Sequence, residues 1–497
     1  MARFLETHLE KQARERPEKD AFRLNGDAIG FQELQADSDR LQRLLSSLHI
    51  GPGDRVGIYM DKCLDMPRAV YGILKSGAAY VPLDTAAPAA RTAGIIEDCK
   101  INILLTQPNK ADSLKEVLAL APALTHIIGA EVSGVMTLAI DQDAPETKVT
   151  KQRTPSDPAY ILFTSGSTGK PKGMVHTHAS GLAYMDMTVD LFGFTDKDRM
   201  ANQSPLHFDM AMLEFFSGIS VGATVVIIPE VLTKLPASLS QLIAEERITT
   251  WYSVPFALIQ LAEYGVLDKR DLTSLRWIIF GGAPMSNRHL HQLQTQLPDA
   301  RFSNSYGPAE ANQVTYYHLP KDPHPIHDPV PIGKPCEHTE IKITPEGELL
   351  IASTAMMEGY WNADHLNEKA FVWRDGQRFY KTGDLVKCSK DGDLEYLGRK
   401  DRQVKIRGFR IELDEVELAI SSHPSVSEVA VLVAEDGLNL EAYVTPSPAQ
   451  TADEQELQTH VRNLLPAAFV PAKIEIREAF TRTPTGKIDR TVLRISA

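Results

Sequence analysis

The sequence predicts a mainly parallel α/β core followed by a smaller α+β unit, and three observations lead to that prediction. Short, continuous apolar runs alternate with amphipathic segments up to about residue 330. Uninterrupted apolar strands separated by helices are typical of a parallel sheet covered on both faces. Beyond that point the runs shorten and glycine-containing turns divide them, which favours antiparallel pairing. The chain of 497 residues is also longer than one hydrophobic core usually serves, so we expect more than one domain.

The elements of the first part follow from the spacing of their apolar residues. Segments 34–48 and 70–74 have apolar residues at helical spacing. The β-branched and aliphatic runs around them have the length of buried strands. The predicted strands are 55–60, 79–83, 101–105, 223–228 and 277–280.

The last part of the chain predicts a compact α+β unit. Antiparallel strands are expected before it, within 340–351 and 393–398, and the unit itself is expected to hold a strand at 403–406, a helix at 413–421 and a strand at 426–433. The polar stretch 398–402 lies where the two patterns meet, and domain boundaries fall in such stretches. We therefore predict an N-terminal domain over 1–398, which holds the nucleotide and substrate pocket, and a C-terminal lid domain over 399–497.

The balance of charge argues against two classes of partner. Lys and Arg number 52 and Asp and Glu number 65, which gives a net charge of −13. Nucleic acids and anionic membranes are bound by an excess of basic residues, so we expect neither. The four cysteines lie far apart without a Cys-x-x-Cys pair, as in reduced thiols of a cytoplasmic protein. The sequence shows neither an apolar signal segment nor a membrane-spanning run, so we expect a cytoplasmic location.

The strongest motif is a strand that runs into a loop rich in glycine, hydroxyls and lysine, over 160–173. Glycines let backbone N–H groups point at phosphate oxygens, hydroxyls add donors and lysines add positive charge. It differs from a Walker loop because only two residues separate Gly166 from Gly169, and Pro171 follows Lys170 where Ser or Thr is required. The motif therefore predicts a phosphate site of another kind.

This loop, Thr-Ser-Gly-Ser-Thr-Gly-Lys-Pro-Lys-Gly, resembles that of the adenylate-forming enzymes, which include acyl-CoA synthetases, luciferases and peptide-synthetase adenylation domains. Further segments resemble other motifs of this family in the same order, so the resemblance covers essentially the whole chain. It implies an enzyme that uses ATP and Mg²⁺ to activate a carboxylate. These further segments are 77–84, 304–310, 380–385, 398–408 and 484–490.

The resemblance also implies which residues bind the nucleotide. Asp384 would accept hydrogen bonds from the ribose hydroxyls, and Arg399 would approach the nucleotide. Ala309 stands where the family usually has threonine, which removes one hydroxyl near the α-phosphate, worth about 1 kcal/mol. The implied nucleotide-binding residues are Thr164, Ser165, Gly166, Ser167, Thr168, Gly169, Lys170, Gly282, Ala283, Asn304, Ser305, Tyr306, Ala309, Asp384 and Arg399.

Four further residues carry the expected chemistry. A lone carboxylate that faces a triphosphate suits Mg²⁺, and by resemblance Glu310 is that ligand. Lys487 resembles the lysine that bridges the substrate carboxylate and the α-phosphate, where a point cation offsets developing charge. Lys172 is assigned to catalysis with it. Asp401 resembles the hinge on which the small domain rotates between the two half-reactions.

The acyl pocket resembles that of the amino-acid-activating members. Asp209 aligns with the carboxylate that pairs with the substrate α-amino group, and such a group would reject fatty acids because it would be left unpaired. Bulky Met210, Leu213 and Tyr252 favour a substrate with a small side chain, while the amide of Gln313 requires a hydrogen-bond partner. Proline and a small polar or unusual amino acid therefore both stay open. The predicted pocket consists of Asp209, Met210, Leu213, Tyr252, Ile279, Gly281, Ser305, Gln313 and Val314, with Lys487 at the carboxylate end.

The acceptor is expected to be a thiol on another molecule. The sequence ends ten residues after Lys487, so we expect a separate phosphopantetheinylated carrier protein, or CoA, and a monomeric enzyme. The alternatives are an acyl- or aryl-CoA ligase, a D-alanine–carrier protein ligase and an inactive nucleotide-binding homologue.

Overall fold

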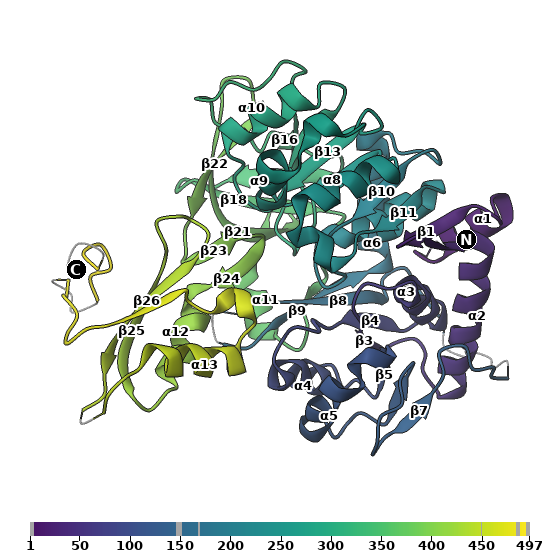
Figure 1. The fold of residues 1–497 in the computed structure, drawn as a ribbon, viewed down its shortest axis with the longest axis horizontal. Coiled ribbons are helices and arrows are strands. Elements are labelled where there is room, and N and C mark those ends of the chain that lie inside the picture. Colours follow the sequence, from purple (N-terminus) through teal and green to yellow (C-terminus); the bar gives the residue numbers. More distant parts are fainter. Residues whose placement is uncertain (1–3, 146–151, 167–168, 449, 484–487, 494–497) are drawn as a thin grey trace.

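The early part of the chain forms two large, mainly parallel sheets with helices against them, and the late part forms a smaller α+β unit to one side (Figure 1). The computed structural model describes residues 4–145, 152–166, 169–448, 450–483 and 488–493. The predicted fold class is confirmed. No helix within these residues has both the length and the apolar character needed to cross a bilayer.

The sheet that carries the glycine-rich loop has the strand order β19-β9-β8-β4-β3-β5-β6-β7. Its pairs from β8 to β7 are parallel, and β9 and β19 add antiparallel partners at one edge. The predicted strands at 55–60, 79–83 and 101–105 are confirmed as β3, β4 and β5. The strands are β3 (Arg55–Tyr59), β4 (Ala79–Pro82), β5 (Ile103–Thr106), β6 (His126–Ile128), β7 (Met136–Leu138), β8 (Pro158–Thr164), β9 (Lys172–Thr177) and β19 (Gly359–Tyr360), with helices α3 (Asp65–Ser76), α4 (Ala89–Asp98) and α5 (Ala111–Leu120).

The second sheet has the order β16-β15-β14-β13-β12-β10-β11-β1-β2 and is parallel from β14 to β1. The predicted strands at 223–228 and 277–280 are β11 and β13, and the predicted helix at 34–48 is α2. The strands are β1 (Asp20–Leu24), β2 (Asp27–Gly30), β10 (Arg199–Asn202), β11 (Thr224–Ile227), β12 (Thr250–Ser253), β13 (Trp277–Gly281), β14 (Arg301–Tyr306), β15 (Thr315–His318) and β16 (Lys334–Pro335). The helices are α1 (Thr7–Glu15), α2 (Phe31–Ser47), α6 (His178–Phe192), α7 (Ile219–Val221), α8 (Pro236–Glu245), α9 (Pro255–Tyr264) and α10 (Asn287–Gln296).

An antiparallel sheet follows, as the change of pattern near residue 330 predicts. Its order is β17-β18-β21-β20, with β22 paired to β21. The strands are β17 (Thr339–Ile343), β18 (Glu348–Ser353), β20 (Phe371–Arg374), β21 (Gln377–Cys388) and β22 (Leu394–Arg399), with helix α11 (Asp364–Ala370).

The C-terminal unit has a hydrophobic core of its own, built from residues such as Ile411, Val416 and Leu457. It begins with the hairpin β23 (Gln403–Ile406) and β24 (Phe409–Glu412). Arg407 and Gly408 turn this hairpin with positive φ of 51° and 89°, as a tight two-residue turn requires. The boundary at 398/399 stays a prediction. The remaining elements are α12 (Leu413–Ser421), β25 (Val426–Val433), β26 (Leu440–Pro446), α13 (Glu454–Leu464) and β27 (Lys473–Ile476).

Candidate active site

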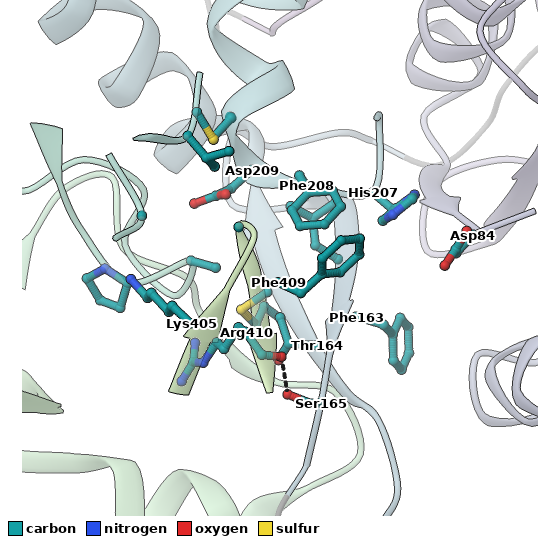
Figure 2. Close-up of a pocket in the computed structure, with 18 of the residues that line it drawn as sticks. Asp84, Phe163, Thr164, Ser165, His207, Phe208, Asp209, Lys405, Phe409 and Arg410 are labelled. Atoms are coloured by element: carbon teal, nitrogen blue, oxygen red, sulfur yellow. Dashed lines mark hydrogen bonds between the residues drawn. The ribbon is translucent and has the colours of Figure 1, made fainter. Parts of the chain in front are cut away.

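A cavity of ≈ 170 Å³ opens between the carboxyl ends of parallel strands and the hairpin β23–β24. Pro82 ends β4, Thr164 ends β8 and Gly282 follows β13, and all three line it. Lys405 and Arg410 of the hairpin line the opposite side (Figure 2). Ligands of open α/β sheets bind outside the carboxyl ends of the strands, so the cavity lies where a ligand site is expected.

The glycine-rich loop forms one wall of this cavity. Thr164 and Ser165 line it, and a Cβ at Gly166 would lie 2.0 Å from the Lys170 carbonyl oxygen, so only glycine fits there. The Thr164 hydroxyl is buried and lacks a hydrogen-bond partner among the residues described, whereas Ser165 Oγ donates to the Arg410 carbonyl oxygen at 2.7 Å (Figure 2). An unpaired buried donor at this point fits a phosphate oxygen. Of the other predicted loop residues, Gly169 and Lys170 are exposed, and Ser167 and Thr168 lie outside the described residues.

The predicted ribose-side residues form a connected network. The Tyr306 hydroxyl donates to Asp384 Oδ2 at 2.5 Å, and Arg399 donates to Asp384 Oδ1 at 2.8 Å. Arg399 also makes two hydrogen bonds of 2.7 Å to the Asp401 carboxylate. Burial opposes ionisation of Asp401, but Arg399 outweighs it and lowers the pKa of that carboxyl. The predicted hinge is thus tied to the predicted nucleotide arginine. Asp384, Arg399, Ser305, Ala309 and Gly282 line the cavity, whereas Ala283, Asn304 and Tyr306 are not part of its lining.

Glu310 is the buried acid beside this cavity. Its side chain is 0% exposed, the Tyr360 hydroxyl donates to Oε1 at 2.6 Å, and Arg410 donates to Oε2 at 2.6 Å. Burial raises the pKa of Glu310, but Arg410 and Tyr360 outweigh it and bring the pKa down to about 2. Mg²⁺ takes one or two carboxylates together with phosphate oxygens, and an ionised carboxylate next to the cavity fits that role, although Glu310 itself is not part of the cavity lining. Within the described part of the chain no cluster of three His, Cys, Asp or Glu could hold a metal by itself, so phosphate oxygens would have to complete the shell.

Asp209 and Lys405 face the inner end of the cavity with opposite charges (Figure 2). Neither forms a salt bridge with any residue that the structure describes. Burial raises the pKa of Asp209, and Lys405 works against this rise. Burial likewise lowers the pKa of Lys405, against the attraction of Asp384 and Asp209. Burial thus works against the charge of each group, and an oppositely charged group of a ligand would favour the ionised form of each.

The predicted substrate pocket divides into lining residues and residues behind them. Met210, Tyr252 and Ser305 line the cavity with Asp209. Ser305 Oγ and Gln313 Nε2 are both buried without a hydrogen-bond partner among the described residues, and each residue is 3% exposed. Leu213, Ile279, Gly281, Gln313 and Val314 are buried but do not line the cavity in this arrangement, and their roles stay predictions.

A second cavity of ≈ 580 Å³ adjoins the first. His207, Phe208 and Phe409 line both, and Phe208 meets Phe409 edge to face with 5.6 Å between ring centroids. The second cavity continues toward Lys234 and Arg407. The aromatic pair therefore stands between the inner site and a longer passage.

No role was predicted from the sequence for Lys405 and Arg410 of the hairpin β23–β24. Lys405 lies inside the motif 398–408, and Arg410 lies just beyond it. Two cationic residues on either side of a glycine turn are the sequence feature that could have indicated their place in the site. Lys172 of β9 also meets this hairpin, because its Nζ lies 3.4 Å from Glu412 Oε1. Lys487 lies outside the described residues. On either side of it, Phe480 and Leu493 pack with β25 and β26 in a small apolar cluster of the C-terminal unit.

Comparison with known proteins gives similarity over nearly the whole chain. Residues 9–361 match the model of the AMP-binding enzyme family, and residues 415–487 match its C-terminal domain. The chain is 33% identical to L-proline--[L-prolyl-carrier protein] ligase of Pseudomonas fluorescens, over 94% of each protein. It is also 33% identical to surfactin synthase subunit 1 of Bacillus subtilis, of which it spans 14%.

Solved structures give the same picture. The adenylation domain AlmE of Vibrio cholerae in complex with glycyl-adenosine-5'-phosphate is 25% identical, with a TM-score of 0.85 over 99% of this chain and 97% of that one. The amide bond synthetase McbA of Marinactinospora thermotolerans has a TM-score of 0.88 over 99% of each chain at 24% identity, a likeness of fold.

Proposed function

Because this chain belongs to the AMP-binding enzyme family, we propose that it activates a small amino acid as its adenylate and transfers it to a carrier-protein thiol. The proposal of an amino-acid substrate rests on Asp209, whose carboxyl group lines the cavity without a salt-bridge partner among the described residues. A substrate ammonium would supply that cation. An acyl chain without an amino group would leave the carboxylate desolvated and unpaired, which is costly.

In the first half-reaction, a carboxylate oxygen of the amino acid attacks the α-phosphorus of ATP, and pyrophosphate leaves. The unpaired Thr164 hydroxyl would donate to a phosphate oxygen, and Asp384 would accept from the ribose. Glu310 would hold Mg²⁺, which when bound offsets charge on the triphosphate. By family resemblance, Lys487 would sit between the attacking carboxylate and the α-phosphate.

In the second half-reaction, a thiolate sulfur attacks the acyl carbon, the carbon–oxygen bond to the phosphate breaks, and AMP leaves with that electron pair. The thiol proton passes to solvent. Lys405 is the described cation free to stabilise the departing phosphate, since it has no carboxylate partner in the cavity. The second cavity, behind Phe208 and Phe409, would admit the thiol arm of the carrier.

For the side chain of the substrate we propose a small polar group. Met210 and Tyr252 limit the space, and the unpaired Ser305 Oγ of the cavity lining favours a hydrogen-bonding partner such as a hydroxyl. Proline is the alternative, supported by the resemblance to a proline–carrier protein ligase.

The test is amino-acid-dependent ATP–pyrophosphate exchange with L-Ser, L-Ala, L-Pro, D-Ala, diamino acids and benzoates. We expect exchange with one small L-amino acid, loss of exchange in Asp209→Ala, and loading of a phosphopantetheinylated carrier in preference to CoA. Exchange only with acids that lack an amino group would move the protein to the acyl- or aryl-CoA ligases. A preference for D-Ala would favour the D-alanine–carrier ligases, and no exchange with any acid would favour an inactive homologue.

A further inference from the structure

His207 lies where the two cavities of the candidate site meet. It lines both of them, and its ring centroid is 4.8 Å from that of the adjacent Phe208. In Figure 2 the imidazole of His207 and the carboxyl group of Asp209 lie on either side of Phe208. A thiol that reaches the inner site from the second cavity therefore passes His207.

The second half-reaction needs an acceptor for the thiol proton. A thiol with an ordinary pKa of about 8.5 is only a few per cent thiolate at pH 7, and the thiolate is the nucleophile. Among the described residues that line both cavities, the two that titrate are Asp84 and His207. Of these two side-chain types, imidazole matches a thiol more closely, because its ordinary pKa of about 6.5 is nearer to 8.5.

The ring of His207 is in a state to accept that proton. It forms neither a hydrogen bond nor a salt bridge with the residues that the structure describes. Burial lowers the pKa of His207, Asp84 and Glu230 work against this lowering, and Lys62 adds to it. The ring is therefore neutral at pH 7, and a neutral imidazole has one unprotonated nitrogen.

Lys62, the cation that acts on His207, is held by backbone carbonyls. Its ammonium donates to the carbonyl oxygens of Asn202 at 3.2 Å and Ile228 at 3.1 Å, and also to that of Gln203. These bonds use all three donors of the ammonium and favour its protonated form, so Lys62 does not compete for the thiol proton. The remaining charged residues of the second cavity are Asp61, Lys234 and Arg407.

We propose that His207 is the general base of thioester formation and takes the proton of the incoming thiol as its sulfur attacks the acyl carbon. The proton moves from sulfur to the unprotonated ring nitrogen, and the sulfur electron pair forms the carbon–sulfur bond. AMP leaves with the electron pair of the carbon–oxygen bond. The imidazolium then releases the proton to solvent through the second cavity. This inference rests on the proposed function in one respect, the transfer of the acyl group to a thiol.

The test follows thioester formation in a single turnover of the whole chain. The enzyme first forms its adenylate from ATP, Mg²⁺ and the labelled acid that best supports exchange, with pyrophosphatase present, and is then mixed with pantetheine. Pantetheine is the free thiol arm, so the identity of the carrier does not matter. The labelled thioester is measured from pH 6 to pH 9 in wild type, His207→Gln, His207→Ala and, as the matched control, His338→Gln. His338 is an exposed histidine that lines neither cavity.

Both His207 variants should form the thioester about 10²-fold more slowly than wild type at pH 7, the lower end of what a positioned base contributes. His338→Gln should match wild type. The wild-type rate should be level between about pH 7 and 8.5, because the base is already neutral there. In His207→Gln the logarithm of the rate should rise by about one per pH unit over the same range, because the thiol must ionise first. A residue that only shapes the cavity would lower the rate and leave this profile unchanged.

A loss of less than about threefold in either His207 variant at pH 7, or a pH profile parallel to that of wild type, would overturn the proposal. The wild-type profile decides the matter if a variant forms no adenylate. A wild-type rate that itself rises by one logarithmic unit per pH unit from 7 to 8.5 would overturn the proposal without any variant.

The outcome is separate from that of the proposed substrate class. The acid is chosen by exchange, so exchange only with acids that lack an amino group would overturn the amino-acid assignment and leave this test in place. Absence of exchange with every acid would overturn both.

Discussion

The replacement Asp209→Asn tests the amino-acid assignment most directly. It keeps the shape of the side chain and removes its charge, so the proposed pair with the substrate ammonium is lost while the cavity wall stays. Removing one partner of a buried ion pair typically costs about 3–5 kcal/mol. Asp209 faces a cavity and also feels the Lys405 charge, so the lower half of that range applies.

At about 1.4 kcal/mol for each factor of ten, this cost lowers kcat/KM for the amino acid by about 10² to 10³. The assay is ATP–pyrophosphate exchange at saturating ATP over a range of amino-acid concentration. Asp84→Asn is the matched control, because Asp84 lines the same cavity at the end beside His207 (Figure 2). A loss of less than about threefold in Asp209→Asn, or an equal loss in Asp84→Asn, would refute the pairing.

Three further changes have distinct expected results. Lys405→Ala should keep exchange within about threefold of wild type and lower carrier loading at least about tenfold, whereas Lys487→Ala should lower exchange and, because loading consumes the adenylate, carrier loading as well; labelled amino acid on the carrier gives the measurement. Ser305→Ala should shift the ratio of kcat/KM for serine over alanine by about 10- to 100-fold toward alanine, because it removes a hydroxyl of the cavity lining that alanine leaves unpaired; an unchanged ratio would exclude Ser305 from selection. Burial raises the pKa of Glu214 to about 8, so its contribution to stability is present below pH 4.5 and is lost as pH rises through 8. The melting temperature of wild type relative to Glu214→Gln should therefore fall from pH 5 to pH 8 and level off above, and a constant difference would contradict the burial of this acid.

The fold could be predicted because local patterns specify it. Runs such as Ile103–Thr106 are apolar at every position but the last and are bounded by helices, a combination typical of a strand buried on both faces. The helix at Phe31–Ser47 follows from apolar residues at helical spacing. Such signals lie within one element, so a single sequence is enough to detect them.

The site could be predicted only as a set of residue types. The contact between Glu310 and Arg410 joins positions 100 residues apart, and nothing in either segment specifies the other as its partner. The same holds for Gln313, whose amide was predicted to line the pocket and whose side chain lies behind the cavity wall. Whether a buried polar group is paired depends on the packing of distant elements, and that is a property of the assembled structure.

The charged residues of the cavity that lack a partner indicate which charges the ligand carries. Among the described residues around the cavity, Glu310 has Arg410 and Asp384 has Arg399. At the inner end Asp209 and Lys405 are left, one negative and one positive and each without a salt bridge to a described residue. An aminoacyl adenylate carries the complementary charges, an ammonium next to its acyl carbon and a phosphate just beyond it. An acyl adenylate without the amino group would satisfy Lys405 and leave Asp209 desolvated and unpaired, so the unpaired charges of the cavity favour the amino acid.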